Sequence, residues 1–303
     1  MTSNVENITR SLSIVALLAT FGCQTQGGFG TPSNTTLSPD EQEIQRRTKH
    51  VAVETLHLKL DKDVTAGHKD NFSGLRTENI SFSQRLDSRT FFAYDKRFSN
   101  TKETGMNEED DDTLLKRSHD LLERLNIPTP EIASARVVQE NTQVGERDAK
   151  TGQLKLESIK PGKRWVRITR QVDGVPVFSS RATVGFMPNR EIGFLEVHWP
   201  QIPAEVLKKA GGYLHLIEKD WHVPELKGAR VESVTAGIVH SPAAATAMDI
   251  VPVIRVIYSP LDNHIGKKPV AYVDAEGKPV TMPRVFLQPP REELKTERRS
   301  HQG

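Results

Sequence analysis

The sequence predicts an α+β fold, in which antiparallel sheets each carry a helix packed on one face. A leucine-rich amphipathic segment precedes a run of short β-type segments that are separated by turn residues, and this order then recurs once. Runs of hairpins with helices on one face favour α+β over an alternating α/β fold. The two runs delimit two candidate modules, roughly 113–200 and 203–285. Their sequences are too dissimilar to establish a duplication.

The first predicted helix covers residues 113–125. Its leucines recur at helical spacing and share one face, with charged residues mostly opposite. These leucines are Leu114, Leu115, Leu121, Leu122 and Leu125. The acidic run 107–112 precedes them and favours a helix N-terminus, where unpaired N–H groups attract negative charge. A calcium loop needs oxygen ligands at alternate positions and a glycine at the sharp turn, which this run lacks.

Strands are predicted on both sides of a second helix. Asp173-Gly174 indicates a tight hairpin, and Pro188-Asn189 indicates a second turn. The second helix is expected over 204–221, with a glycine defect at Gly211-Gly212. The predicted strands are 135–140, 154–158, 165–172, 175–184, 192–199, 230–240, 251–258, 270–273 and 278–282.

The N-terminal part is predicted to be mixed. Residues 51–60 alternate in the manner of a strand, although both sides hold apolar residues. Residues 61–79 are polar and are expected to be irregular, whereas the aromatic stretch 88–98 is expected to be a strand.

The composition argues against nucleic-acid binding. Lys and Arg number 41 against 39 Asp and Glu, and the basic residues are spread along the chain. Such binding depends on many basic contacts to phosphates. Hydrophobic residues make up 36% of the chain, which suggests folded modules separated by polar segments.

An export signal is predicted at the N-terminus. The apolar run 11–22 is too short to cross a bilayer but suits the core of a signal peptide. The single cysteine, Cys23, follows it directly, and the polar stretch 24–38 reads as a flexible tether. This order resembles a bacterial lipoprotein signal, which implies lipidation at Cys23. Thr20 and Phe21 depart from the family pattern, so an ordinary secretory peptide or a buried apolar segment stays open.

A second resemblance concerns the body of the chain. The segment 165–199 resembles the FTP propeptide module of thermolysin-type metallopeptidases, with Gln171, Gly174, Pro176 and Val177 at matching places. The segment 251–280 resembles the end of a PepSY domain, where Val273, Asp274, Ala275 and Gly277 form the matching turn. The resemblance implies PepSY- or cystatin-like modules that inhibit or help fold a peptidase, or that stand alone in envelope proteins. The chain carries no peptidase signature after them.

The domain prediction divides the chain into six parts. These are a signal peptide (1–22), a tether (23–39), a mixed segment (40–110), an FTP-like module (111–202), a PepSY-like module (203–287) and a disordered tail (288–303).

Known catalytic motifs are missing from the sequence. HExxH, G-x-S-x-G and a phosphate-binding glycine loop are all absent. His215 and His222 stand too far apart for one metal, about 10 Å along a helix. His198 is expected to be buried with a satisfied ring nitrogen. Trp165, Trp199 and Trp221 are expected to pack in the core.

A candidate binding face comprises Arg167, Arg170 and Arg181, which are expected to project from one open face of the sheet, because alternate strand residues share a face. The turn motifs are Gly174, Asp274 and Gly277, which have structural roles, since hairpin turns need positive φ and Asp caps turns. No catalytic residue, metal or cofactor is predicted, and any small-molecule ligand is left open.

The leading hypothesis is an exported, non-catalytic binding or regulatory protein in the cell envelope, on its periplasmic or extracytoplasmic face. A lipid anchor would tether it to the membrane, and its partner would be a peptide or an envelope protein such as a peptidase, held at an open sheet or sheet edge. Two alternatives stay open: an assembly component of an envelope complex, and a hydrolase with a dispersed site. A soluble secreted form is the alternative localisation.

Overall fold

The computed structural model describes residues 38–69, 71–99, 107–147, 154–219, 221–240, 250–261 and 268–280. The predicted signal peptide, Cys23, most of the tether and the tail 288–303 lie outside these residues. Within the described part of the chain, no helix is both long and apolar enough to cross a bilayer.

The fold is mixed α+β with few helices and mostly antiparallel strands, as the sequence predicts. The contacts divide the chain into two units. Unit 1 comprises the described residues up to Arg170 together with Arg181–Trp199, and unit 2 comprises Gln171–Ser180 and the described residues from Pro200 onward.

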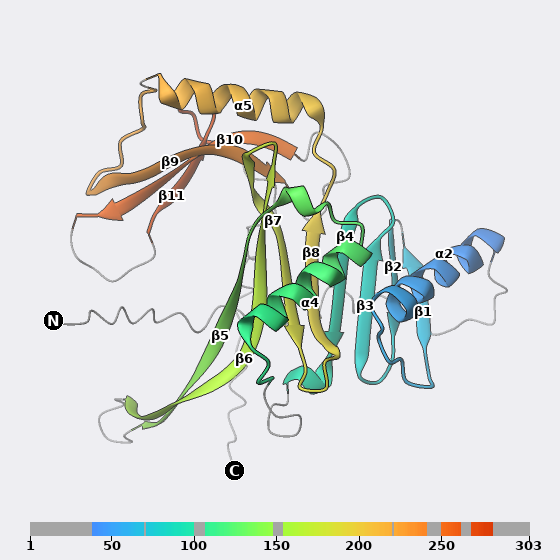
Figure 1. Ribbon diagram of the computed structural model, residues 1–303. Helices are drawn as coiled ribbons and strands as arrows, with labels where there is room; N and C mark the ends of the chain where they lie inside the picture. The colour runs from blue at the N-terminus through green and yellow to red at the C-terminus, as the bar shows by residue number, and fades with distance from the viewer. Residues whose placement is uncertain are drawn as a thin grey trace, which may run out of the picture. The chain divides into compact units, whose positions relative to one another are not determined.

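Unit 1 contains an antiparallel sheet with two helices on one face (Figure 1). Its sheet follows the order β1-β2-β3-β4-β8-β7, and β6 pairs with β7 and with β5. The helical elements are α2 (Pro39–His50), η1 (Val51–Thr55), η2 (Lys96–Ser99), α4 (Asp111–Arg124) and η3 (Thr129–Glu131). The strands are β1 (Thr65–Lys69), β2 (Phe72–Arg76), β3 (Ile80–Arg85), β4 (Arg89–Asp95), β5 (Ile132–Arg147), β6 (Leu154–Val172), β7 (Val175–Phe186) and β8 (Ile192–Trp199).

The predicted leucine-rich helix is confirmed as α4. Asp110 is its N-cap and accepts a hydrogen bond from the Thr113 N–H at 2.8 Å, with Asp111 and Asp112 in the first turn. The acidic run therefore caps the helix, as expected. Leu114, Leu121 and Leu122 of α4 are buried in one core with sheet residues, and Leu115 packs against it partly buried. The sheet residues include Val184, Leu195, Val197 and Trp199.

The strand predicted over 51–60 is wrong. The chain begins α2 with a capping box, in which Ser38 and Glu41 bond reciprocally, and continues helically through η1. Ala52 and Leu56 stand four residues apart and are both buried, so the apolar residues follow a helical period rather than alternation. A strand over 51–60 would place apolar residues on both of its faces, which fits a half-buried strand poorly.

The irregular structure predicted for 61–79 is also wrong, because this segment forms β1 and β2. Thr65 pairs with Arg76 and Lys69 pairs with Phe72 in a regular antiparallel ladder. Leu75 is an apolar residue that is buried, and the backbone pairing between β1 and β2 stabilises the mostly polar rest of the segment. The strand predicted over 88–98 is confirmed as β4, which ends in η2.

The opposite face of the unit 1 sheet carries an aromatic cluster. Phe98 of η2 packs edge-on against Trp165 at a centroid separation of 5.0 Å, and Trp165 packs in the same manner against Phe194. The Phe98 ring lies directly on Gly185 and Gly193, where any side chain would collide with it. The glycines therefore make room for the ring.

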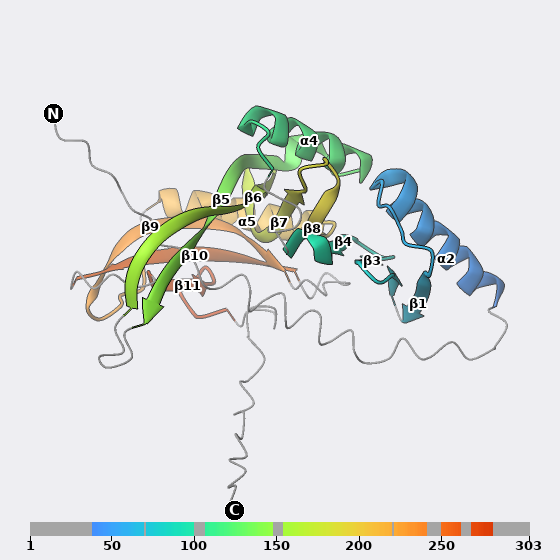
Figure 2. The same cartoon turned by 90° about the horizontal axis from the view of Figure 1, so that it is seen from below.

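Unit 2 contains an antiparallel group of strands with one helix (Figure 1). Its elements are the first half of β7, α5 (Ala204–Glu218), β9 (Ala229–His240), β10 (Ile250–Pro260) and β11 (Val270–Val273). β10 pairs with β9 and β11, while β7 meets β9 in parallel at Val177 and Ile238. Figure 2 shows the curvature of β9 and β10.

Helix α5 covers one face of these strands. Tyr213 shares a core with Ala236, Ile254 and Val256, which lie on alternate positions of β9 and β10. The predicted helix is confirmed, although it ends at Glu218 rather than at Trp221. The helix runs through Gly211 and Gly212, and a Cβ added at either position would meet nothing within 4 Å.

The predicted turns are confirmed. Asp173 and Gly174 have φ values of 49° and 78°, which match the hairpin turn in which both central residues have positive φ. Asp274 accepts hydrogen bonds from the N–H groups of Glu276 and Lys278, and Gly277 has φ 77°. These residues have the structural roles that the sequence suggested. After this turn, Pro279 bridges back to Val273, whereas the end of the strand predicted over 278–282 lies outside the described residues.

Candidate functional site

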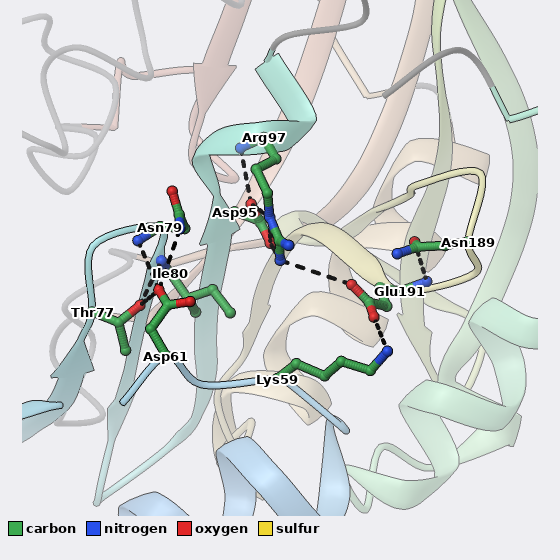
Figure 3. A network of polar contacts seen from close by, with 9 residues as sticks. All are labelled: Lys59, Asp61, Thr77, Asn79, Ile80, Asp95, Arg97, Asn189 and Glu191. Atoms are coloured by element: carbon green, nitrogen blue, oxygen red, sulfur yellow. Dashed lines mark hydrogen bonds and ion pairs between the residues drawn. The ribbon is translucent and has the colours of Figure 1, made fainter. Parts of the chain in front are cut away.

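A polar network of unit 1 connects the segment after η1 to η2 and to two turns, the one between β2 and β3 and the one between β7 and β8 (Figure 3). Arg97 forms an ion pair with Asp95 at 2.6 Å and a longer one with Glu191 at 3.8 Å. Lys59 forms a further ion pair with Glu191. The chain of contacts therefore runs from the segment after η1 to η2 and to the turn between β7 and β8.

Asp61 forms the second node of this network. Its Oδ2 accepts a hydrogen bond from the Thr77 hydroxyl at 2.7 Å and from the Asn79 N–H at 3.1 Å. These hydrogen bonds, with the Thr77 bond the larger influence, hold the pKa of Asp61 below its usual value. Asp61 thereby fixes the turn between β2 and β3 and stays ionised.

The charged residues of this network suit a structural role. Burial raises the pKa of Glu191, but Lys59 and Asn189 outweigh it, and the resulting pKa is lowered. Asp95 likewise holds the pKa of Arg97 above its usual value. Asp61 and Glu191 are thus stabilised as anions and Arg97 as a cation, which is unsuited to proton transfer near neutral pH.

A second cluster lies on the face of the unit 1 sheet that carries the aromatic cluster. Glu196 Oε1 lies 3.0 Å from His198 Nε2, and Arg181 donates to both carboxylate oxygens of Glu196 at 3.0 and 3.2 Å. His198 is nearly buried, as predicted, but only one ring nitrogen has a partner, since Nδ1 is buried without a hydrogen bond. An enclosed Nδ1 cannot reach a substrate, so this acid–histidine pair lacks the geometry of a catalytic dyad.

The ionisation of Glu196 makes the stability of the folded protein depend on pH in the acid range. Burial raises its pKa, but the His198 hydrogen bond and the Arg181 charge outweigh burial and hold the pKa of Glu196 at about 2. A depressed folded-state pKa stabilises the fold above the unfolded-state value of 4.5 and loses that contribution as the pH falls toward about 2. The contribution amounts to about 3 kcal/mol at neutral pH.

The variant Glu196→Gln is expected to show a shallower loss of stability between about pH 5 and pH 2, because it lacks this titration. Denaturant unfolding across this range measures the effect. Glu205→Gln, an exposed change on α5, should keep the wild-type pH dependence. Parallel pH profiles for Glu196→Gln and the wild type would contradict the assignment.

A serine–histidine contact lies in the interior of unit 2. Ser180 Oγ is 2.8 Å from His240 Nε2, and the His240 N–H donates to Ser179 Oγ at 2.7 Å. Only 2% of Ser180 and 1% of His240 are exposed to solvent. This burial closes the hydroxyl to a substrate, so the contact stabilises the strands and does not constitute a nucleophilic site.

The candidate arginine face does not form as expected. Arg170 is three residues from Arg167, and an odd separation places the two side chains on opposite faces of β6. Arg170 is buried, pairs with Glu131 at 2.7 Å and lies over the ring of Trp199. Arg181, in contrast, is exposed and pairs with Glu196. The structure therefore separates Arg170 from the other two residues.

The remaining predicted residues have structural positions. Trp165 and Trp199 are buried, and Trp221 is partly buried with its indole N–H donating to the Ala275 carbonyl at 2.7 Å. His215 is exposed and contacts Glu218. No three His, Cys, Asp or Glu side chains of the described segments gather in a way that would hold a metal ion.

The face of unit 2 opposite α5 carries a cluster that the sequence did not reveal. Arg255 lies over the ring of Phe178, with its guanidinium carbon 4.0 Å from the ring centroid. Phe178 and Tyr272 form a tilted aromatic pair at 6.2 Å. Arg255 pairs across the ladder with Tyr272 on β11 and with Thr235 on β9. We call Phe178, Arg255 and Tyr272 the arginine–aromatic cluster.

Gly237 positions this cluster. A Cβ at this residue would lie 2.6 Å from both the Phe178 ring and the Pro176 carbonyl oxygen, so only glycine admits the ring here. Burial raises the pKa of Tyr272, which the positive charge of Arg255 partly offsets. Tyr272 therefore stays neutral and can act as a hydrogen-bond donor or acceptor.

One feature of the sequence indicates this site. Arg255 is the only charged residue of β10, in the run IVPVIRVIYSP. A charge inside an apolar strand needs either a partner or a function. The two aromatic residues come from other strands, 77 residues before and 17 residues after it by numbering, which single-segment reasoning could not connect.

No known protein family matches the chain, and no curated protein matches it either. Among solved structures, the chain is similar to an uncharacterised protein from Eubacterium rectale. The two are 12% identical, the match covers 82% of this chain and 83% of the other, and the TM-score is 0.41.

Proposed function

We propose that this protein is an exported, membrane-tethered binding protein of the cell envelope, and that the face of unit 2 opposite α5 holds an extended peptide. The observation that carries the proposal is the arginine–aromatic cluster. It lies on the sheet face opposite α5, and its arginine forms no ion pair with a described residue. The signal-like run before Cys23 supports export and tethering.

A helix laid across one face of an antiparallel sheet is also what the PepSY- or cystatin-like interpretation expects. In unit 2 this arrangement coincides with the segment whose sequence resembles a PepSY domain, and the Asp274–Gly277 turn is formed. The interpretation supports a regulatory module that engages a polypeptide, such as part of an envelope peptidase, without catalysis of its own.

The face is a better candidate than the sheet edge. On the outer side of β11, the Val280 N–H donates to the Tyr272 carbonyl and Pro279 bridges to Val273. These contacts use part of the edge, which reduces its capacity to add another strand. The side chains of Ile257 and Val270 continue the face beyond Arg255, and Val270 is 47% exposed.

A site-specific crosslink tests the proposal. A photoreactive benzoylphenylalanine replaces Val270 in the full chain, expressed in bacterial cells, and the matched control replaces Lys209 on the exposed side of α5. We expect light-dependent adducts from position 270 that an excess of a captured peptide suppresses, and none from position 209. Equal adducts from both positions, or none from either, would contradict peptide binding at this face.

The tether is tested separately with the Cys23→Ser variant. The wild-type chain should sediment with membranes and be released by detergent, whereas Cys23→Ser should appear in the soluble fraction. A wild-type chain that is already soluble would overturn the lipid anchor but leave peptide binding to be judged by the crosslink.

A further inference from the structure

Arg255 differs from four other arginines that are withdrawn from solvent. Arg255 is half-buried, and its Nε is enclosed without a hydrogen-bond partner. Among the described residues, none accepts a hydrogen bond from its guanidinium or forms an ion pair with it. Four other arginines of comparable or greater burial each pair with a carboxylate: Arg85, Arg117, Arg164 and Arg170.

This arrangement has an energetic cost that a ligand would remove. A guanidinium that is partly withdrawn from water loses solvation, and the ring of Phe178 offsets only part of that loss. The enclosed Nε is out of a ligand's reach, but the two terminal nitrogens of the guanidinium are not enclosed, and their N–H donors lie in one plane that matches the two oxygens of a carboxylate. A bound carboxylate would provide the counter-charge that the described residues of unit 2 do not.

The surroundings of Arg255 define what must accompany the carboxylate. Ile257 and Val270 pair across the ladder, and each stands two residues along its strand from Arg255 and Tyr272 respectively. Alternate residues of an extended chain repeat every ~6.6–6.8 Å, which is also the spacing of these two rows. A peptide lying along the strands therefore presents alternate side chains to the charged row and to the apolar row.

We infer that unit 2 binds an extended peptide carrying an acidic residue two positions from a large apolar residue, with the acidic side chain on Arg255 and the apolar one on Ile257 and Val270. This inference rests on the proposed function and gives its ligand a chemical class. Phe178 and Tyr272 flank the carboxylate, exclude water from it and thereby strengthen its pairing with the guanidinium.

The test uses the full chain in detergent and short randomised peptides, pooled by the residue fixed at one central position. Pools with Asp or Glu at that position should bind at least about tenfold more tightly than the matched Asn or Gln pools. Within the acidic pools, Leu, Ile or Phe should be enriched two positions away. The preference should weaken as salt concentration rises, because it is electrostatic.

Two variants test whether Arg255 causes the preference for acidic peptides. Arg255→Met keeps an unbranched side chain against Phe178 and should abolish the acidic preference while apolar pools still bind. Lys209→Met makes the same change of charge on the exposed side of α5 and should leave the preference intact. Both variants are first checked for wild-type thermal unfolding, so that a loss of binding reports on the site.

The outcomes separate the two proposals. Binding without an acidic preference, or a preference that survives Arg255→Met, overturns this inference and leaves peptide binding standing. No binding by any pool overturns both. Self-association of the chain through this face, seen as a concentration-dependent mass that Arg255→Met reduces, would identify a second copy as the occupant and would likewise overturn the inference.

Discussion

Replacing Glu131 with leucine is expected to lower the free energy of unfolding by about 3–5 kcal/mol. Glu131 Oε2 accepts hydrogen bonds from the Arg170 Nε and the Trp199 Nε1, both at 2.8 Å. Arg170 is buried, and although burial lowers its pKa to about 10, it stays charged at neutral pH. The variant would retain a buried cation and remove the carboxylate that neutralises it. Denaturant unfolding of both proteins at neutral pH measures the difference.

A second substitution identifies the cause. Arg170→Met in the Glu131→Leu background removes the buried charge, and it should recover about 2 kcal/mol of the lost stability, since an apolar replacement leaves no buried cation without its partner. A residual loss of about 1–3 kcal/mol should remain, because the Trp199 N–H has lost its acceptor. Glu123→Leu, an exposed change on α4, should alter stability by less than about 0.5 kcal/mol. A Glu131→Leu protein as stable as this control would refute the account.

The second large effect is expected from Gly193→Ala, which should destabilise the protein by about 1–3 kcal/mol. The new methyl group would overlap the ring of Phe98, because that ring lies on the bare backbone of β8. Phe98 has little freedom to move, since it packs on Trp165 and lies against Gly185 on the neighbouring strand. Thermal or denaturant unfolding gives the measurement.

Gly211→Ala is the matched control for Gly193→Ala. It adds the same methyl group inside α5, where nothing lies within 4 Å of the new atom. Alanine is favoured over glycine in a helix by about 1 kcal/mol, so this variant should be unchanged or more stable. If both substitutions had the same sign, the contact between Phe98 and Gly193 would not explain the first result.

The sequence was most informative where one element carries its own pattern. Helix α4 combines an apolar stripe with an acidic cap, and both features are local, so the helix was predicted closely. The Asp173-Gly174 hairpin followed from backbone preference alone. Residues 51–60 failed because their apolar residues fit two periods, and the capping box at Ser38 decided between them from outside the segment.

The candidate site was less predictable because its partners meet only after folding. The sequence predicts Arg170 on one face with Arg167, but strand parity alone separates them, and Arg170 pairs with Glu131 in a different element. Phe178, Arg255 and Tyr272 come from three strands, and Gly237 on a fourth admits the aromatic ring. Their proximity depends on register, which the sequence does not specify across long separations.

The distribution of the tryptophans gives each unit its own fluorescent reporter. Trp165 and Trp199 lie within unit 1 and Trp221 within unit 2, so a Trp221→Phe chain emits from unit 1 alone. A chain with both other indoles replaced would report on unit 2, provided that it still folds. Emission can therefore show whether the two units unfold together or in sequence, and to which unit each loss of stability belongs.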